Sequence, residues 1–146
     1  MPSNVVAVLF ALALFQAPSP LSLFTYSRDS AHGFKDDLLD AFRRELEKHS
    51  DSFTELAYSR EQAQVSIQFL GQGDLTVELG DGGEPARYLW RFDETAPRSW
   101  AIVRVGRMGT FSKEFWVEGR GARDLSRLAK AIAEWIRENS AAIREP

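Results

Sequence analysis

The chain has 146 residues, a formal net charge of −3, 44% hydrophobic residues and no cysteine. These values fit one globular domain, and they exclude disulfides, thiolate metal sites, cysteine nucleophiles and a lipid-modified N-terminal cysteine. The acidic balance gives no electrostatic reason to expect nucleic acid as a partner.

The chain opens with eleven consecutive apolar residues, Val5 to Phe15, and its first charged side chain is Arg28. A run of about 7–15 apolar residues is typical of a secretory signal, whereas a membrane-spanning helix needs about 20. We therefore interpret residues 1–20 as a signal peptide and expect a periplasmic, envelope or secreted protein. The alternatives are membrane association through an uncleaved anchor at residues 5–24, and a buried first element of the domain.

Residues 21–146 form the predicted domain, beginning with a short strand at residues 21–27. Two helices are predicted, at residues 34–49 and at about 122–139. In each, apolar residues recur at spacings of three and four, which gives the helix one face to bury. The side chains expected on these faces include Leu38, Phe42, Leu46, Leu125, Leu128, Ile132 and Ile136.

Five short runs of alternating apolar and polar residues lie between the helices, separated by glycine-rich or polar turns. Patterning with a period of two is typical of strands. The runs are residues 63–70, 75–79, 86–92, 100–105 and 111–118. Residues 53–62 fit either a further strand or a helical turn that begins at Ser59.

The predicted fold class is α+β, an antiparallel β-meander of about five strands with two amphipathic helices packed on one face. This order of elements is similar to that of small accessory domains of the bacterial cell envelope, a likeness of fold that implies no particular activity. We expect the helices to pack on Val65, Ile67, Phe69, Val77, Trp90 and Val103.

The sequence contains no recognisable catalytic, metal or cofactor motif. Its two histidines, His32 and His49, do not have the spacing of a zinc site. The glycine pairs at residues 71–73 and 119–121 lack the third glycine of a dinucleotide-binding loop. We therefore predict no catalytic residue, no metal and no cofactor.

Charge is distributed unevenly over the strands. Residues 51–97 carry nine acidic and three basic side chains, whereas residues 98–130 carry three acidic and eight basic ones. Opposite charges on neighbouring strands can pair, as Glu78 with Arg87 or Arg91, and Arg104 with Glu114. Alternatively, the basic side chains form a surface for a phosphate, an anionic headgroup or an acidic protein.

Strand alternation predicts that Trp100 and Trp116 share one face of the sheet with Arg91 and Arg104. Exposed tryptophan beside arginine is a common composition of binding hot spots, although an arginine stacked on the ring can also simply shield it. We predict that a protein or an anionic envelope component binds here. The candidate partner-binding residues are Trp100, Trp116, Arg91, Arg104, Arg107, Arg120 and Arg123.

The predicted function is that of an exported, non-enzymatic binding or accessory domain. One alternative is a structural subunit of an envelope assembly, joined through a sheet edge. The other is a small hydrolase without a recognisable motif, which would need a pocket with converging Asp, Glu or His side chains. The sequence leaves the oligomeric state open.

Overall fold

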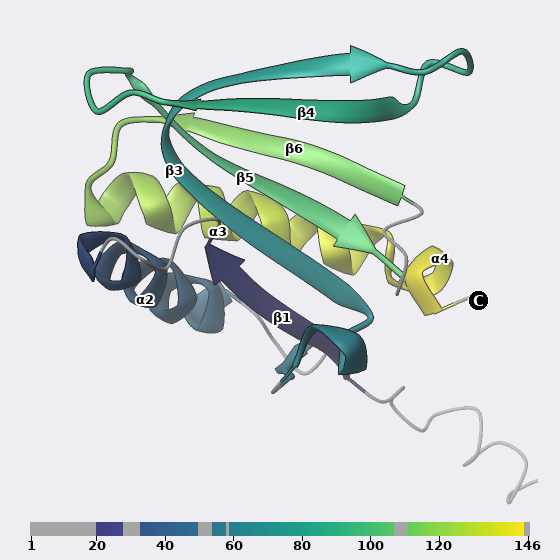
Figure 1. The fold of residues 1–146 in the computed structure, drawn as a ribbon. Coiled ribbons are helices and arrows are strands. Elements are labelled where there is room, and N and C mark those ends of the chain that lie inside the picture. The colour runs from purple at the N-terminus through teal and green to yellow at the C-terminus, as the bar shows by residue number, and fades with distance from the viewer. Residues whose placement is uncertain (1–19, 28–32, 50–53, 58, 107–110, 145–146) are drawn as a thin grey trace, which may run out of the picture.

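The structure is a computed structural model that describes residues 20–27, 33–49, 54–57, 59–106 and 111–144 (Figure 1). The apolar run of the predicted signal peptide and the candidate residue Arg107 lie outside these ranges. Within them, no helix combines the length and the hydropathy of a membrane span.

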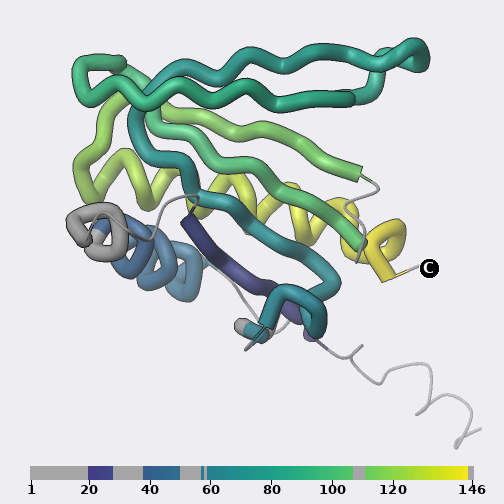
Figure 2. Tube along the Cα trace, in the orientation of Figure 1, coloured from purple at the N-terminus to yellow at the C-terminus, as the bar shows by residue number. Residues whose placement is uncertain are grey.

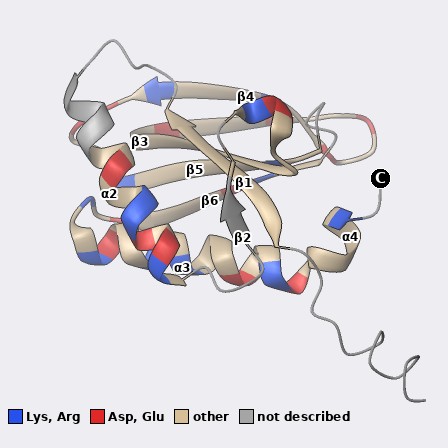
Figure 3. Cartoon of the chain, turned by 90° about the horizontal axis from the view of Figure 1, so that it is seen from below, with Lys and Arg blue, Asp and Glu red and all other residues tan. Residues whose placement is uncertain are grey.

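The predicted α+β class is confirmed, because a mostly antiparallel sheet carries two long helices on one face (Figure 1). Helix α2 (Gly33–His49) and helix α3 (Ala122–Glu138) begin and end within one residue of the predicted bounds. A short helix, α4 (Ser140–Arg144), follows α3. Acidic and basic residues alternate along the outer surfaces of α2 and α3 (Figure 3), as expected of helices with one solvated face.

The strands are β1 (Leu21–Ser27), β2 (Thr54–Leu56), β3 (Val65–Leu79), β4 (Pro85–Phe92), β5 (Arg98–Val105) and β6 (Phe111–Glu118). The main sheet has the order β2-β1-β3-β5-β6. β1 pairs in parallel with β2 and β3, whereas β5 pairs antiparallel with β3 and β6. A 3₁₀ turn, η1 (Arg60–Gln62), follows β2, so residues 53–62 contain both a strand and a helical turn.

The turn predicted between the first two runs is wrong, because β3 continues through residues 71–74 as one strand. Its first half pairs with β5, and its second half pairs with β4. The strand bends near Gly71, where the register with β5 shifts and φ is 78°, a conformation that favours glycine. The bend carries the β3–β4 hairpin over the face of the sheet opposite the helices (Figures 1 and 2).

The core between the sheet and the helices contains most of the side chains predicted for it. The Phe42 and Phe69 rings stack with centroids 5.0 Å apart, which joins α2 to β3. Leu38 is half-buried at the margin. Burying one such side chain stabilises the fold by about 1.5–3 kcal/mol. The predicted residues found buried in this core are Phe42, Leu46, Val65, Ile67, Phe69, Val103, Leu125, Leu128, Ile132 and Ile136.

Val77 and Trp90 were predicted for this core, and that prediction is wrong. Both lie in the β3–β4 hairpin, and Trp90 packs against the opposite face of the sheet. There, the side chains of the hairpin and of β5 form a second, smaller core. Its members are Leu70, Trp100 and Ile102, with the half-buried Leu75, Tyr88 and Trp90 packed against them.

Candidate functional site

The β3–β4 hairpin covers part of the sheet face that was predicted to bind a partner (Figure 1). Trp100 is only 8% exposed, and its Nε1 donates a hydrogen bond to the carbonyl oxygen of Gly73 at 2.9 Å. Within the hairpin, a Cβ at Gly73 would collide with the Arg91 carbonyl oxygen and lie 2.6 Å from the Trp90 ring, so β3 and β4 pack this closely only with glycine at this position. Trp100 therefore belongs to the second core and has little surface to offer a partner.

Trp116 lies on the same face but remains 45% exposed. It is paired with Trp100 across β5 and β6, with ring centroids 6.1 Å apart. The guanidinium carbon of Arg98 lies 4.2 Å from the centre of the Trp116 ring, a cation–π contact that covers one side of the indole. An indole held in place by an arginine, and still half exposed, has the composition of a binding hot spot.

Arg98 was not among the candidate residues, because it lies in the polar segment between the predicted strands at residues 86–92 and 100–105. The signal was present, because Arg98 precedes Trp100 by two residues and must point to the same face of the strand. The β5–β6 register then places Arg98 opposite Glu118, two residues beyond Trp116.

Arg104 forms internal contacts instead of offering a free cation. It is half-buried, and its Nη1 donates hydrogen bonds to Tyr26 Oη at 3.1 Å and to Gln68 Oε1 at 2.8 Å. Its guanidinium carbon also lies 5.8 Å from the centre of the Tyr88 ring. The Tyr88 hydroxyl donates to Ser112 Oγ at 3.0 Å, and burial raises the pKa of Tyr88. This network fastens the hairpin to β1, β3 and β6.

Only some of the predicted cross-strand charge pairs occur in the observed strand register. β4 places Arg87 opposite Glu78 and Arg91 opposite Asp74. Alternation directs Arg91 away from the sheet, because its neighbour Trp90 packs toward it. The prediction that Arg91 shares a face with the two tryptophans is therefore wrong. Arg104 also does not lie opposite Glu114, because its register partner on β6 is Ser112.

Arg120 and Arg123 lie at the same end of the sheet as Trp116. Arg120 follows β6, is exposed, and donates from Nη1 to Gln72 Oε1 at 3.3 Å. Arg123 is exposed in the first turn of α3, on the helix layer. We define the Trp116 surface as Trp116, Arg98 and Arg120.

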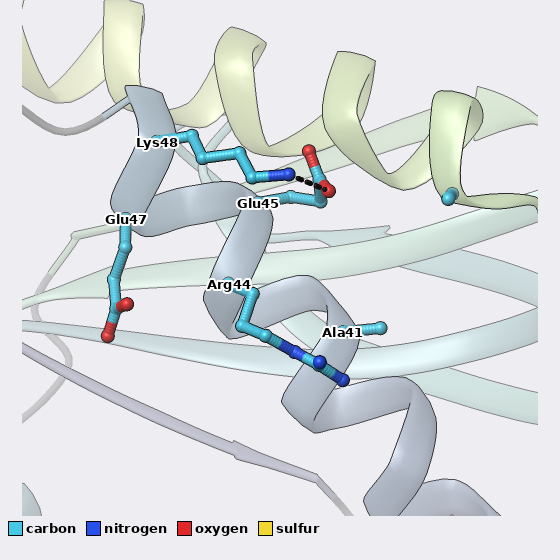
Figure 4. Close-up of a pocket in the computed structure, with 6 residues that line it drawn as sticks. Ala41, Arg44, Glu45, Glu47 and Lys48 are labelled. Carbon is cyan, nitrogen blue, oxygen red and sulfur yellow. Dashed lines mark hydrogen bonds and ion pairs between the residues drawn. The ribbon is translucent and has the colours of Figure 1, made fainter.

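A hollow of about 570 Å³ lies on the helix layer, between α2 and the start of α3 (Figure 4). In Figure 4, the Lys48 side chain reaches toward Glu45, and its Nζ lies 3.0 Å from Glu45 Oε1. The hydrogen bond from Lys48 lowers the pKa of the Glu45 carboxyl. The residues that line the hollow are Ala41, Arg44, Glu45, Glu47, Lys48 and Ala122.

Next to this hollow, His49 Nε2 lies 2.9 Å from Ser126 Oγ, the type of pair that a hydrolase would require. The nearby Glu45 carboxylate, however, hydrogen-bonds Ser126. In a Ser-His-acid triad the carboxylate instead orients the other nitrogen of the histidine. The contacts therefore hold α2 against α3. Nor do three or more His, Cys, Asp or Glu side chains within the described ranges gather as they would around a metal ion.

An apolar notch of about 330 Å³ lies at the other end of β6, between the sheet and the end of α3. Phe111 is 55% exposed there and stacks on Trp135 with ring centroids 5.8 Å apart. Lys113 Nζ lies 5.8 Å from the centre of the Trp135 ring. The residues that line the notch are Val105, Phe111, Trp135, Asn139, Ala142 and Ile143.

No protein-family model matches the chain, and no curated protein matches it. Among solved structures, it is similar to two structures of the PelC dodecamer from Paraburkholderia phytofirmans, each at 12% sequence identity. One, a single-residue variant, has a TM-score of 0.33 and aligns over 81% of this chain and 83% of PelC. The other has a TM-score of 0.35 and aligns over 81% and 84%. A likeness of this degree supports no functional conclusion.

Proposed function

We propose that the chain is an exported, non-enzymatic binding or accessory domain, and that a protein or an anionic envelope component binds at its Trp116 surface. The observation that carries the proposal is the unequal burial of the tryptophan pair, 8% exposure for Trp100 against 45% for Trp116. Apolar surface left in water gives up hydrophobic stabilisation that a partner restores when it covers the ring.

Arg98 indicates the chemistry of the partner. Its guanidinium rests on the indole and presents hydrogen-bond donors beside it. A partner group that combines an apolar part with a carboxylate or phosphate would contact both side chains at once. Arg120, at the same end of the sheet, adds a second positive charge. This composition supports a ligand of negative charge.

The position of β1 supports export with a removable signal over a retained anchor. Leu21 and Leu23 are buried in β1, so a membrane segment cannot include residues 21–24 while the domain is folded. Of the predicted anchor at residues 5–24, only residues 5–20 could therefore lie in a membrane. The apolar run that precedes them is shorter than the about 20 residues that a spanning helix needs.

The binding proposal is tested by capture from the native envelope fraction with the parent chain and two variants. Trp116→Ser should reduce the captured partner at least about fivefold, the loss that corresponds to about 1 kcal/mol at a hot spot. Leu79→Ser is the matched control, because Leu79 is 65% exposed and lies in the hairpin, away from Trp116. Equal capture by Trp116→Ser and the parent would overturn the assignment of the site.

Export is tested separately, by the intact mass of the protein isolated from the cells that produce it. A mass that lacks the apolar run, in an envelope or secreted fraction, is the expected result. A full-length protein in the cytoplasm would contradict export, and a full-length protein in the membrane would select the anchor.

A further inference from the structure

We propose that Asp81, at the tip of the β3–β4 hairpin, is a site of spontaneous isomerisation to isoaspartate. The inference is independent of the proposed function. Asp81 and Gly82 form the one Asp-Gly pair of the sequence, which contains no Asn-Gly pair. At such a pair the backbone nitrogen of the glycine attacks the aspartate side chain, because glycine has no side chain to hinder the approach.

The reaction needs no enzyme, oxidant or reductant. The Gly82 nitrogen bonds to Cγ of the protonated Asp81 carboxyl, and the N–H proton leaves with the carboxyl OH as water. A cyclic succinimide remains. Water then opens the ring at either carbonyl. Attack at the side-chain carbonyl regenerates aspartate, whereas attack at the main-chain carbonyl leaves the chain running through Cγ, which is isoaspartate.

The turn at the hairpin tip leaves the attacking amide without a partner. Residues 80–83 form a β-turn, in which Gly83 N donates to the Gly80 carbonyl oxygen at 3.0 Å. The closing bond of a β-turn joins its first and fourth residues, so the amide of the third residue takes no part in it. Among the described residues, no acceptor bonds the Gly82 N–H. The attack therefore requires no hydrogen bond of the fold to be broken.

The side chain that is attacked is also unrestrained. Asp81 and Gly82 are both exposed, as is typical of a loop tip, so water reaches the succinimide and can open it. In the part of the chain that the structure describes, no hydrogen bond or ion pair holds the Asp81 carboxyl. Its side chain is therefore free to rotate toward the Gly82 nitrogen.

The other described aspartates lack this combination. Each is followed by a residue with a side chain, and those in α2 and β3 lie in regular structure. Asp93 Oδ1 accepts hydrogen bonds from the Thr95 N–H at 2.9 Å and from its hydroxyl at 2.7 Å. Asp124 Oδ1 lies 2.7 Å from Arg127 Nη2. These contacts hold the carboxyl groups away from the next backbone nitrogen, so the reaction should be selective for Asp81.

Isomerisation changes the hairpin tip and leaves the rest of the domain. Isoaspartate at position 81 adds a methylene carbon to the main chain, inside the turn that the bond between Gly83 and Gly80 closes. The β3–β4 ladder already shifts register after Glu78, so an irregularity separates the turn from the regular ladder. We therefore expect the second core and the Trp116 surface to keep their structure.

The test incubates the purified full chain in neutral buffer at physiological temperature, beside two variants. An isoaspartyl methyltransferase with a labelled methyl donor measures isoaspartate, and peptide mapping locates it. We expect isoaspartate to form at position 81 at least about ten times faster than at any other described aspartate. Asp81→Glu keeps the charge but needs a larger ring, so it should lose the label at this position. Gly82→Ala, whose Cβ would meet the flexible end of Glu84, should slow the reaction by a similar factor.

Equal rates at Asp81 and Asp74, or an undiminished label in Asp81→Glu, would overturn the proposal. The aged chain should keep the hydrogen-exchange protection of the second core, and a loss of that protection would contradict a lesion confined to the tip. The proposed function fails or stands separately. Capture that is indifferent to Trp116 leaves the isomerisation of Asp81 standing, and an aged chain without isoaspartate leaves the Trp116 surface untouched.

Discussion

Trp100 and Trp116 face each other across β5 and β6 with ring centroids 6.1 Å apart, yet the hairpin buries one ring and leaves the other half exposed. We therefore expect Trp100→Ala to lower the free energy of unfolding by about 3–5 kcal/mol, as for a buried aromatic residue. Trp116→Ser should cost less than about 1 kcal/mol. Urea unfolding of the two variants measures the difference. Similar losses would show that Trp116 is also a core residue.

Ile132 tests the helix-side core. Its side chain is fully buried between α3 and the sheet, and Ile132→Ala removes it without changing the charge of the helix. We expect the free energy of unfolding to fall by about 2–5 kcal/mol. The exposed neighbour Lys130 gives the control, since Lys130→Ala should change stability by less than about 0.5 kcal/mol. A loss below about 1 kcal/mol for Ile132→Ala would mean that α3 is peripheral.

Gly73 tests the position of the hairpin. A Cβ at this residue would lie 2.6 Å from the Trp90 ring, so Gly73→Ala must displace the ring or the hairpin backbone. We expect this variant to increase the solvent exposure of Trp90 and Trp100 in the second core, seen as a red shift of tryptophan fluorescence and faster quenching by acrylamide. Thr76→Ala, on the exposed face of the same hairpin, should leave both signals unchanged. Unchanged signals in Gly73→Ala would contradict the close packing of Trp90 against Gly73 in the second core.

Acid should weaken the ion pair between Glu45 and Lys48 within α2. The hydrogen bond from Lys48 lowers the pKa of the Glu45 carboxyl in the folded chain below its value in the unfolded chain. The contact therefore stabilises the fold above the unfolded value of about 4.3 and loses its effect as the pH falls through the lower folded value. Glu45→Gln should be less stable than the parent at neutral pH and should converge with it in acid. A stability difference that is the same at both pH values would contradict this assignment.

The sequence predicted the two helices well because their apolar spacing repeats over several turns and depends only on local residues. It also placed Trp100 and Trp116 on one face, because strand alternation is local. The layer that covers Trp100 was not predictable in this way. It depends on the bend of β3 near Gly71, which the sequence suggested as a turn, and on the long-range packing of Trp90. The parallel pairing of β1 with β3 joins segments on either side of α2, so no local pattern contained it.

The sequence predicted the central residue of the candidate site but not the residues that surround it. Trp116 is where alternation placed it, but the arginine that contacts it is Arg98, whereas Arg104 is taken up by Tyr26 and Gln68. Hydrogen-bond partners of a long, flexible side chain depend on the tertiary structure. Composition therefore gives the number of arginines in this region but does not predict which residues each of them contacts.

Site-specific photo-crosslinking in the cells that produce the protein tests the binding claim most directly. A benzophenone amino acid is placed at position 116 in one variant and at position 79, in the exposed part of the hairpin, in the other. We expect a discrete adduct, in the envelope or secreted fraction, that forms from position 116 and is absent or much weaker from position 79. Equal labelling from both positions, or no adduct from position 116, would contradict a partner at Trp116.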